Sequence, residues 1–308
     1  LIIIPDGALD YLPFETLVTG IKRDASGQSS PQYALERFSI SYGPSASALL
    51  AVRGESPQRS EWNKSLLAFG DPILGPAAPS DTHSAPAMRS ASEELPVAAP
   101  QSATPTEYDR YAERGFSLTR LPFTREEVLS IGRLFPASQR RLYLGTSATE
   151  QAVRSEDLGQ YRYIHFATHG FFDESAPGRS GVLFSRAPGA SGPGVLQPGE
   201  IMRLNMHADL VTLSACSTGL GEMVNGEGIL GLTRAFFYAG AHNLTVSLWN
   251  VNDTATSALM KTFYTRLNHG ASKPEALREA KLQLLRGSNP SWRSPYFWAA
   301  FIVVGEGK

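Results

Sequence analysis

Short apolar runs recur along the chain and alternate with amphipathic stretches of helical period. Many of these runs are hydrophobic at consecutive positions, which is typical of strands buried between two layers of helices. The predicted strands cover residues 1–4, 38–42, 66–70, 141–144, 163–168, 182–185, 210–215, 244–249 and 301–304. The predicted helices cover residues 45–53, 125–135, 228–240, 253–267 and 273–287, and Gly240 is expected to end the third of them. The alternation predicts an α/β fold, in which a mostly parallel central sheet is flanked by helices on both faces.

One long stretch breaks this pattern. Residues 76–120 show no helical or strand period, and their first two thirds are rich in proline and alanine. Such a composition is typical of a mobile surface insertion. The insertion divides the chain into a smaller N-terminal half, residues 1–75, and a larger half, residues 121–308.

Charge and cysteine content narrow the class of protein. The 28 basic and 29 acidic residues give a net charge of −1, which offers no reason to expect nucleic acid or an anionic membrane as a partner. The longest apolar run, residues 296–304, is shorter than the ~20 residues that a bilayer requires. A single cysteine cannot form an internal disulfide, so we expect a reducing, cytoplasmic compartment. The opening LIIIPDG has neither Met nor a basic segment, so we expect no signal peptide and a sequence cut from a longer protein.

Two predicted strand ends carry candidate chemistry. The strand at 163–168 leads into His169 and Gly170, and the strand at 210–215 leads into Cys216, the only cysteine. Sites in open α/β sheets form at the carboxyl edge, where parallel strands end together. A cysteine nucleophile needs a basic partner and N–H donors for an oxyanion. His169 can supply the first, and the backbone N–H groups of Gly170 and Cys216 can supply the second, which is the minimum for acyl transfer.

Each of these residues also has a structural interpretation. A lone cysteine after a strand is most often a small buried hydrophobe, and a lone histidine such as His169 is most often a polar turn residue. The two together are less common, and their separation of 47 residues is similar to that of the caspase His and Cys. His165 lies within a predicted strand and is interpreted as a packed core histidine.

A family resemblance adds to this reading. The blocks that carry it are LIIIPDGALDYLPFETL, RFSISYGPSASALL, LLAFGDP, HFATHGFFDE, ADLVTLSACSTGLGE, GEGILGLTRAFFYAGAHNLTVSLWNVND and YFWAAFIVVG. In this order they resemble the CHAT domain, a family of cysteine peptidases related to caspases and separases, over nearly the whole chain. The resemblance implies a caspase-hemoglobinase-like fold, a pseudo-caspase-like half at residues 1–75 and a Cys216–His169 dyad. Ser217 stands where the family often has Glu, which can change the nearby polar network.

Three further residues are candidates for a substrate pocket. Asp253 follows the strand at 244–249 and is either a helix N-cap or, by the resemblance, an acid that pairs with a substrate Arg or Lys. Asp173 is the rival acid, and it can instead orient His169 or cap a turn. Trp249 either walls the pocket or packs in the core.

The glycines of NGEGILG, residues 225–231, imitate a dinucleotide-binding motif. The preceding strand ends about ten residues too early for that role. A nucleotide is therefore not expected there, and the predicted cysteine mechanism needs no metal and no organic cofactor.

The predicted function is that of a cysteine endopeptidase that cleaves a specific protein substrate, with preference for a basic residue before the cut. The resemblance also implies an N-terminal tetratricopeptide-type repeat or sensor region in the same protein, and a role in prokaryotic signalling or defence. The alternative is a catalytically inactive caspase-like scaffold or protein-interaction module. The presence of both dyad residues argues against this alternative, while Ser217 keeps it open.

Overall fold

The computed structural model describes residues 1–23, 27, 29–46, 62–74, 120–121, 123–171, 178, 180–186, 194–216 and 228–307. Nearly all of the predicted helix at 45–53 and of the predicted insertion at 76–120 falls outside these ranges. No helix in the described ranges is both long enough and apolar enough to cross a bilayer.

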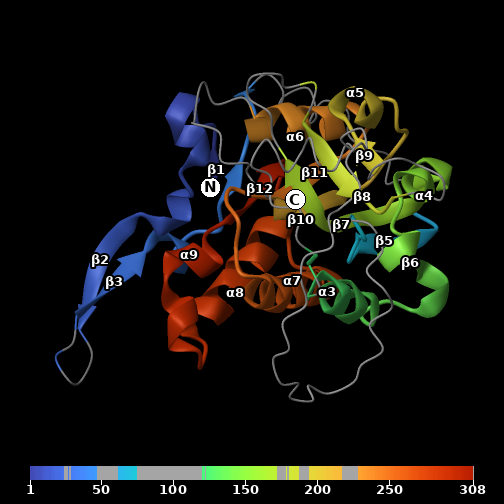
Figure 1. Cartoon of the computed structure of the whole chain (residues 1–308). Coiled ribbons are helices and arrows are strands. Elements are labelled where there is room, and N and C mark those ends of the chain that lie inside the picture. Colours follow the sequence, from blue (N-terminus) through green and yellow to red (C-terminus); the bar gives the residue numbers. More distant parts are fainter. Residues whose placement is uncertain are drawn as a thin grey trace, which may run out of the picture.

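The predicted strands and the four predicted helices that lie in the described ranges recur with shifted ends (Figure 1). The strands are β1 (Ile2–Ile3), β2 (Val18–Arg23), β3 (Ser29–Tyr33), β4 (Ser41–Tyr42), β5 (Lys64–Gly70), β6 (Arg140–Leu144), β7 (Tyr161–Phe171), β8 (Gly181–Phe184), β9 (Gly194–Leu196), β10 (Leu210–Cys216), β11 (Asn243–Ser247) and β12 (Phe301–Gly305). The α-helices are α3 (Phe123–Gly132), α4 (Glu150–Ser155), α5 (Pro198–Ile201), α6 (Gly228–Tyr238), α7 (Asp253–Asn268), α8 (Lys273–Arg286) and α9 (Pro295–Trp298).

One large sheet runs through the molecule in the order β1-β4-β12-β11-β10-β7-β5-β6. Its neighbouring strands are parallel, except that β12 is antiparallel to β11. The hairpin of β8 and β9 extends the sheet from the end of β7. The predicted mostly parallel α/β fold is therefore confirmed. Strands β1, β4 and β5 all come from residues 1–75, so this segment shares one sheet with residues 121–308 and β5 lies next to β7.

Two hydrophobic clusters cover the two faces of the sheet. Helices α4, α5 and α6 contribute to one cluster, and α3, α7, α8 and α9 contribute to the other. Figure 1 shows α5 and α6 on one side of the strands and α3, α7 and α8 on the opposite side. Strand β7 serves both faces, because Ile164 and Phe166 belong to the first cluster and Tyr163 and Ala167 to the second. Apolar residues therefore stand at consecutive positions on either side of His165, as in a strand buried on both faces.

The end of α6 follows the predicted signal. Gly240 has φ +102°, and its N–H donates to the Phe237 carbonyl, while the Ala241 N–H donates to the Phe236 carbonyl, both at 3.0 Å. This pair of bonds is a Schellman motif. A Cβ at position 240 would lie 1.8 Å from the carbonyl oxygen of Met206, so only glycine fits.

An antiparallel hairpin of β2 and β3 projects from the side of the molecule (Figure 1). The sequence analysis did not predict it. Neither strand contains a buried residue, so the hairpin leaves no apolar run in the sequence.

Candidate active site

The carboxyl ends of β7 and β10 lie side by side. Leu213 pairs with Phe166, Ala215 with His169, and Cys216 with Gly170. Between the first two pairs β7 advances by three residues and β10 by two, so β7 contains a bulge immediately before the candidate histidine. Bulges of this kind occur preferentially beside active sites, where they redirect a side chain. The two predicted dyad residues are therefore one register position apart on adjacent parallel strands.

The surroundings of His169 are closed. The residue is 5% exposed, and the neighbouring Thr168 hydroxyl donates to the carbonyl of Leu183 in β8. Gly170 lies between Cys216 on one side and Val182 on the other. Of Cys216 the structure describes the backbone. Residues 217–227 and 172–177 lie outside the described residues, so the roles assigned to Asp173 and Ser217 stay predictions.

A narrow depression opens beside the ends of β10 and β11. Its walls leave room for about one water molecule. Helix α3, strands β10 and β11, the segment that follows β11, and helix α7 all contribute to its wall. The lining residues are Thr124, Glu127, Ser214, Ser247, Trp249, Asn250, Val251, Asp253 and Thr256. The depression thus brings together two of the three predicted pocket residues, Trp249 and Asp253.

Asp253 is not the helix cap. Asn252 caps α7, since its side-chain oxygen accepts from the N–H groups of Thr254 at 3.1 Å and Ala255 at 3.3 Å. The N-cap interpretation of Asp253 is therefore wrong. Asp253 does not cap α7, and it lines the depression instead. Burial raises the pKa of the Asp253 carboxyl above its usual 3.8, and the negative charge of Glu127 raises this pKa further.

Trp249 combines the two predicted alternatives. Its ring lines the depression and also packs against both hydrophobic clusters. The indole N–H donates to the carbonyl oxygen of Tyr296 at 3.0 Å, and the Tyr296 hydroxyl donates to the carbonyl of Asn250 at 2.9 Å. These bonds fix the segment between β11 and α7 that forms one wall of the depression.

Glu127 is a second acid in the depression, and it was not among the predicted site residues. It is 1% exposed, and its Oε1 lies 2.8 Å from Nε2 of His165. His165 is buried, as predicted, and its Nδ1 lies 3.1 Å from the hydroxyl of Tyr264, which donates to Thr212. The sequence does contain a signal, because Glu127 precedes the buried Ile131 by four residues and so falls on the apolar stripe of its helix.

Ser214 is the other residue that was missed. It is 3% exposed, and its hydroxyl has no hydrogen-bond partner among the described residues, although buried hydroxyls are normally paired. Ser214 precedes Cys216 by two residues on β10 and lines the depression. The unpaired hydroxyl and the candidate nucleophile therefore belong to the same strand end.

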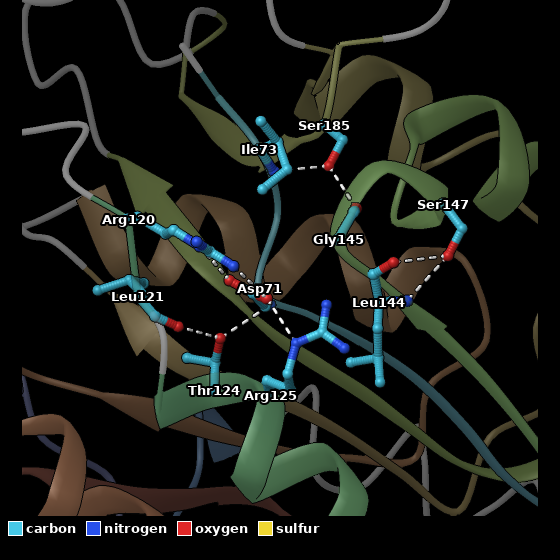
Figure 2. Close-up of polar contacts among 10 residues, drawn as sticks. All are labelled: Asp71, Ile73, Arg120, Leu121, Thr124, Arg125, Leu144, Gly145, Ser147 and Ser185. Carbon is cyan, nitrogen blue, oxygen red and sulfur yellow. Dashed lines mark hydrogen bonds and ion pairs between the residues drawn. The ribbon is translucent and has the colours of Figure 1, made fainter. Parts of the chain in front are cut away.

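A buried ion-pair cluster anchors the wall of the depression (Figure 2). Asp71 directly follows β5, has φ +51° and donates its N–H to the Thr124 hydroxyl at 2.8 Å. Its fully buried carboxylate accepts from Arg120 at 2.9 and 3.1 Å and from Arg125 at 2.7 Å. Figure 2 shows both arginines converging on Asp71 at the start of α3. The cluster fixes the helix that carries Thr124 and Glu127 into the depression.

A family model described as the CHAT domain matches residues 1–306. The chain belongs to the CHAT domain family. This confirms the resemblance seen in the sequence blocks.

Two curated relatives are both named tetratricopeptide repeat protein 28. The Homo sapiens protein is 26% identical over 311 residues, and the Mus musculus protein is 25% identical over 342 residues. In both cases the match covers 99% of this CHAT chain and 12% of the relative. The chain thus corresponds to about an eighth of the length of these relatives.

Two solved structures match most of this chain at low sequence identity. The Saccharomyces cerevisiae separase in its complex with securin matches with a TM-score of 0.46 and 11% identity, over 87% of this chain and 14% of that chain. The Arg-specific cysteine proteinase gingipain R matches with a TM-score of 0.47 and 9% identity, over 87% of this chain and 54% of that chain.

Proposed function

We propose that this CHAT domain is a cysteine endopeptidase in which Cys216 is the nucleophile and His169 carries the proton. The register between β7 and β10 supports the proposal most directly, because it sets Ala215 opposite His169 and Cys216 opposite Gly170 at the carboxyl edge of the sheet. Sites in α/β folds form at this edge. A nucleophile and its base must come within hydrogen-bond reach, and the two residues stand one register position apart on adjacent strand ends.

The proposed reaction proceeds through a thioester. The Cys216 sulfur attacks the carbonyl carbon of the peptide bond, and His169 accepts the thiol proton. The tetrahedral oxyanion is held by the backbone N–H groups of Gly170 and Cys216. His169 then protonates the leaving amine as the C–N bond breaks. Water, deprotonated by His169, attacks the thioester, and the products are a carboxylic acid and the restored thiol.

The depression beside β10 is the proposed pocket for the residue that precedes the cut bond. Asp253 supplies a carboxylate for a basic side chain, and Trp249 supplies an apolar wall for its methylene groups. The substrate is a specific protein. The names of the two curated relatives support a tetratricopeptide region in the same protein, which we propose regulates the peptidase.

Cleavage of peptides by the full-length protein tests this function. We expect Cys216→Ala to abolish cleavage and His169→Ala to slow it by at least ~10³-fold, because both residues act in the same step. Peptidyl electrophiles with Arg, Leu or Asp before the reactive group should label Cys216, with the Arg probe the fastest, as read by mass spectrometry. Wild-type cleavage in Cys216→Ala would contradict the mechanism. Absence of labelling by every probe would favour the inactive scaffold.

A further inference from the structure

We infer that Tyr264 is a positioning residue of the candidate dyad: its hydroxyl joins β7 to β10 and so fixes where Cys216 stands relative to His169. The inference rests on the proposed function, because it concerns the geometry of the proposed nucleophile and base. Tyr264 belongs to α7, and it acts on the dyad through the two strands.

The Tyr264 hydroxyl connects two residues that lie opposite each other on neighbouring strands. His165 of β7 pairs with Thr212 of β10 in the parallel register. The hydroxyl donates to Thr212 Oγ1 at 3.0 Å, and its oxygen lies 3.1 Å from Nδ1 of His165. Because a hydroxyl has a single proton and this one goes to Thr212, the oxygen accepts from an Nδ1–H of His165. We call these three residues the hydroxyl bridge.

The hydroxyl bridge lies just before the irregular end of the two strands. The bridged pair directly precedes the last regular pair, which is Phe166 with Leu213, and the bulge of β7 follows. A bulge disrupts the ladder locally, so backbone pairing alone holds the strand ends less firmly there. A slip of one residue, about 3.3 Å, would carry Thr212 away from Tyr264 and turn its side chain to the other face of the sheet. The hydroxyl bridge therefore selects the register on which the dyad depends.

The hydroxyl bridge also has a rigid support. Nε2 of His165 lies 2.8 Å from Oε1 of Glu127 on α3, and the ion pairs of Asp71 fix the start of this helix (Figure 2). Helix α3 packs against α7, which carries Tyr264. The side chains of the bridge and Glu127 are buried, so water does not compete for their hydrogen bonds. Buried hydrogen bonds that lock the side chains in this way are what a positioning group requires.

Two variants test the bridge from its two ends. Tyr264→Phe deletes the donor hydroxyl, and Thr212→Val replaces the acceptor hydroxyl with a methyl group. We expect each variant to lower kcat for peptide cleavage by the full-length protein about 10- to 100-fold with little change in KM, because a displacement of about 1 Å at a reacting group has an effect of this size. Thr212→Ser keeps the hydroxyl and should restore most of kcat. Tyr264→Phe/Thr212→Val should be little slower than Tyr264→Phe, since both variants lose the same bond.

Two control variants separate positioning from a general loss of stability. Tyr42→Phe removes another buried tyrosine hydroxyl, which donates to Glu15 and lies on β4, separated from β10 by β11 and β12. Thr245→Val removes the hydroxyl of the residue opposite Thr212 on β11, which has no hydrogen-bond partner among the described residues. Both should keep the wild-type kcat. All variants are compared well below the Tm of each, and Thr212→Val serves if Tyr264→Phe does not fold.

Hydrogen exchange and thiol titration report on the hydroxyl bridge without catalysis. The amides of residues 168–171 and 214–216 should exchange at least ~10-fold faster in Tyr264→Phe and Thr212→Val than in the wild type and Thr245→Val. The pH midpoint of Cys216 alkylation should rise in the same two variants toward the value of about 8.5 typical of a free cysteine. Thr212→Ser should keep the wild-type midpoint.

Faster exchange at the strand ends together with a lower kcat supports the inference. Unchanged exchange and an unchanged thiol midpoint in both variants overturn it, whether or not the protein cleaves peptides. Wild-type kcat in both variants also overturns it, and leaves the peptidase intact. If the wild type cleaves no peptide, the proposed function fails, and the exchange rates still decide for or against the hydroxyl bridge.

Discussion

Two buried polar clusters of this domain differ in how completely they are paired. In the first, Glu15, Tyr42 and Lys281 meet in the interior: Lys281 Nζ lies 2.7 Å from Glu15 Oε1, and the Tyr42 hydroxyl donates to Oε2 at 2.5 Å. In the second, Glu127 is bonded to Nε2 of His165, and it lines the depression with Asp253 and with Ser214, whose hydroxyl has no partner among the described residues.

The first cluster has the pairing expected of a structural element. One cation balances one carboxylate, and the Tyr42 oxygen also accepts from the Phe14 N–H at 2.7 Å. Burial lowers the pKa of Lys281, and Glu15 opposes this shift. The cluster ties the N-terminal segment to α8. The second cluster holds two carboxylates against one imidazole, so its acceptors are less completely paired.

The largest expected effect on stability comes from removing the cation of the first cluster. Lys281→Met leaves the Glu15 carboxylate buried without its cation, so we expect the free energy of unfolding to fall by about 3–5 kcal/mol. Urea denaturation measures this change. The double variant Glu15→Gln/Lys281→Met should recover much of the loss, because it removes both charges. A loss below about 1 kcal/mol in Lys281→Met would show that the cluster is not a structural tie.

A smaller loss of stability is expected when the ion pairs of Asp71, which fix the start of α3, are weakened. Asp71→Asn keeps a residue that tolerates positive φ but removes the charge that Arg120 and Arg125 share. Both arginines are about half exposed and can turn to solvent, so we expect a loss of about 2 kcal/mol, the contribution of charged hydrogen bonds. Urea denaturation with Arg133→Gln, an exposed ion-pair variant, is the control. Equal stability of Asp71→Asn and wild type would contradict the anchor.

Removal of the Asp253 charge should stabilise the folded protein at neutral pH, in contrast to the two preceding variants. The raised pKa of Asp253 means that the folded state holds this proton more tightly than the unfolded state, so the contribution of Asp253 to stability falls as pH rises from 3.8 through the raised pKa. We expect Asp253→Asn to match the wild type near pH 4 and to have a Tm a few degrees higher at pH 7. Thermal unfolding at several pH values measures the difference. A lower Tm for Asp253→Asn at pH 7 would contradict the account of the second cluster.

Selectivity should depend on pH for the same reason. Protonation of Asp253 removes negative charge from the proposed pocket, so the preference for Arg over Leu before the cut bond should weaken as pH falls, and it should do so at a higher pH than for an ordinary aspartate. Peptide kinetics between pH 4 and 8 would show this. A preference that stays constant over that range would contradict the role of Asp253 in the pocket.

The sequence predicts those parts of the fold that depend on one local pattern. Continuous apolar runs predicted the buried strands, and Gly240 predicted the end of α6. The β2–β3 hairpin is exposed and therefore has no such pattern. The predicted strand at 38–42 forms only at Ser41 and Tyr42, the two residues that pair with β1.

Prediction of the site had a similar limit. His169 and Cys216 could be placed together because parallel strands end at one edge. Glu127 and Ser214 meet Asp253 only through the contact of α3 and α7 across the end of β10, which no local pattern specifies. The N-cap interpretation of Asp253 is wrong because Asn252, which precedes it, is an equally good capping residue and is the N-cap of α7.

The central claim is that Cys216 and His169 act as a pair across β7 and β10, and the titration of the thiol tests it most directly. Cys216 is the only cysteine, so the rate of alkylation by iodoacetamide reports on this residue alone. The account predicts a thiolate that forms well below the pH of about 8.5 typical of a free cysteine, and a return to that value in His169→Gln. A midpoint near 8.5 in both proteins would contradict it.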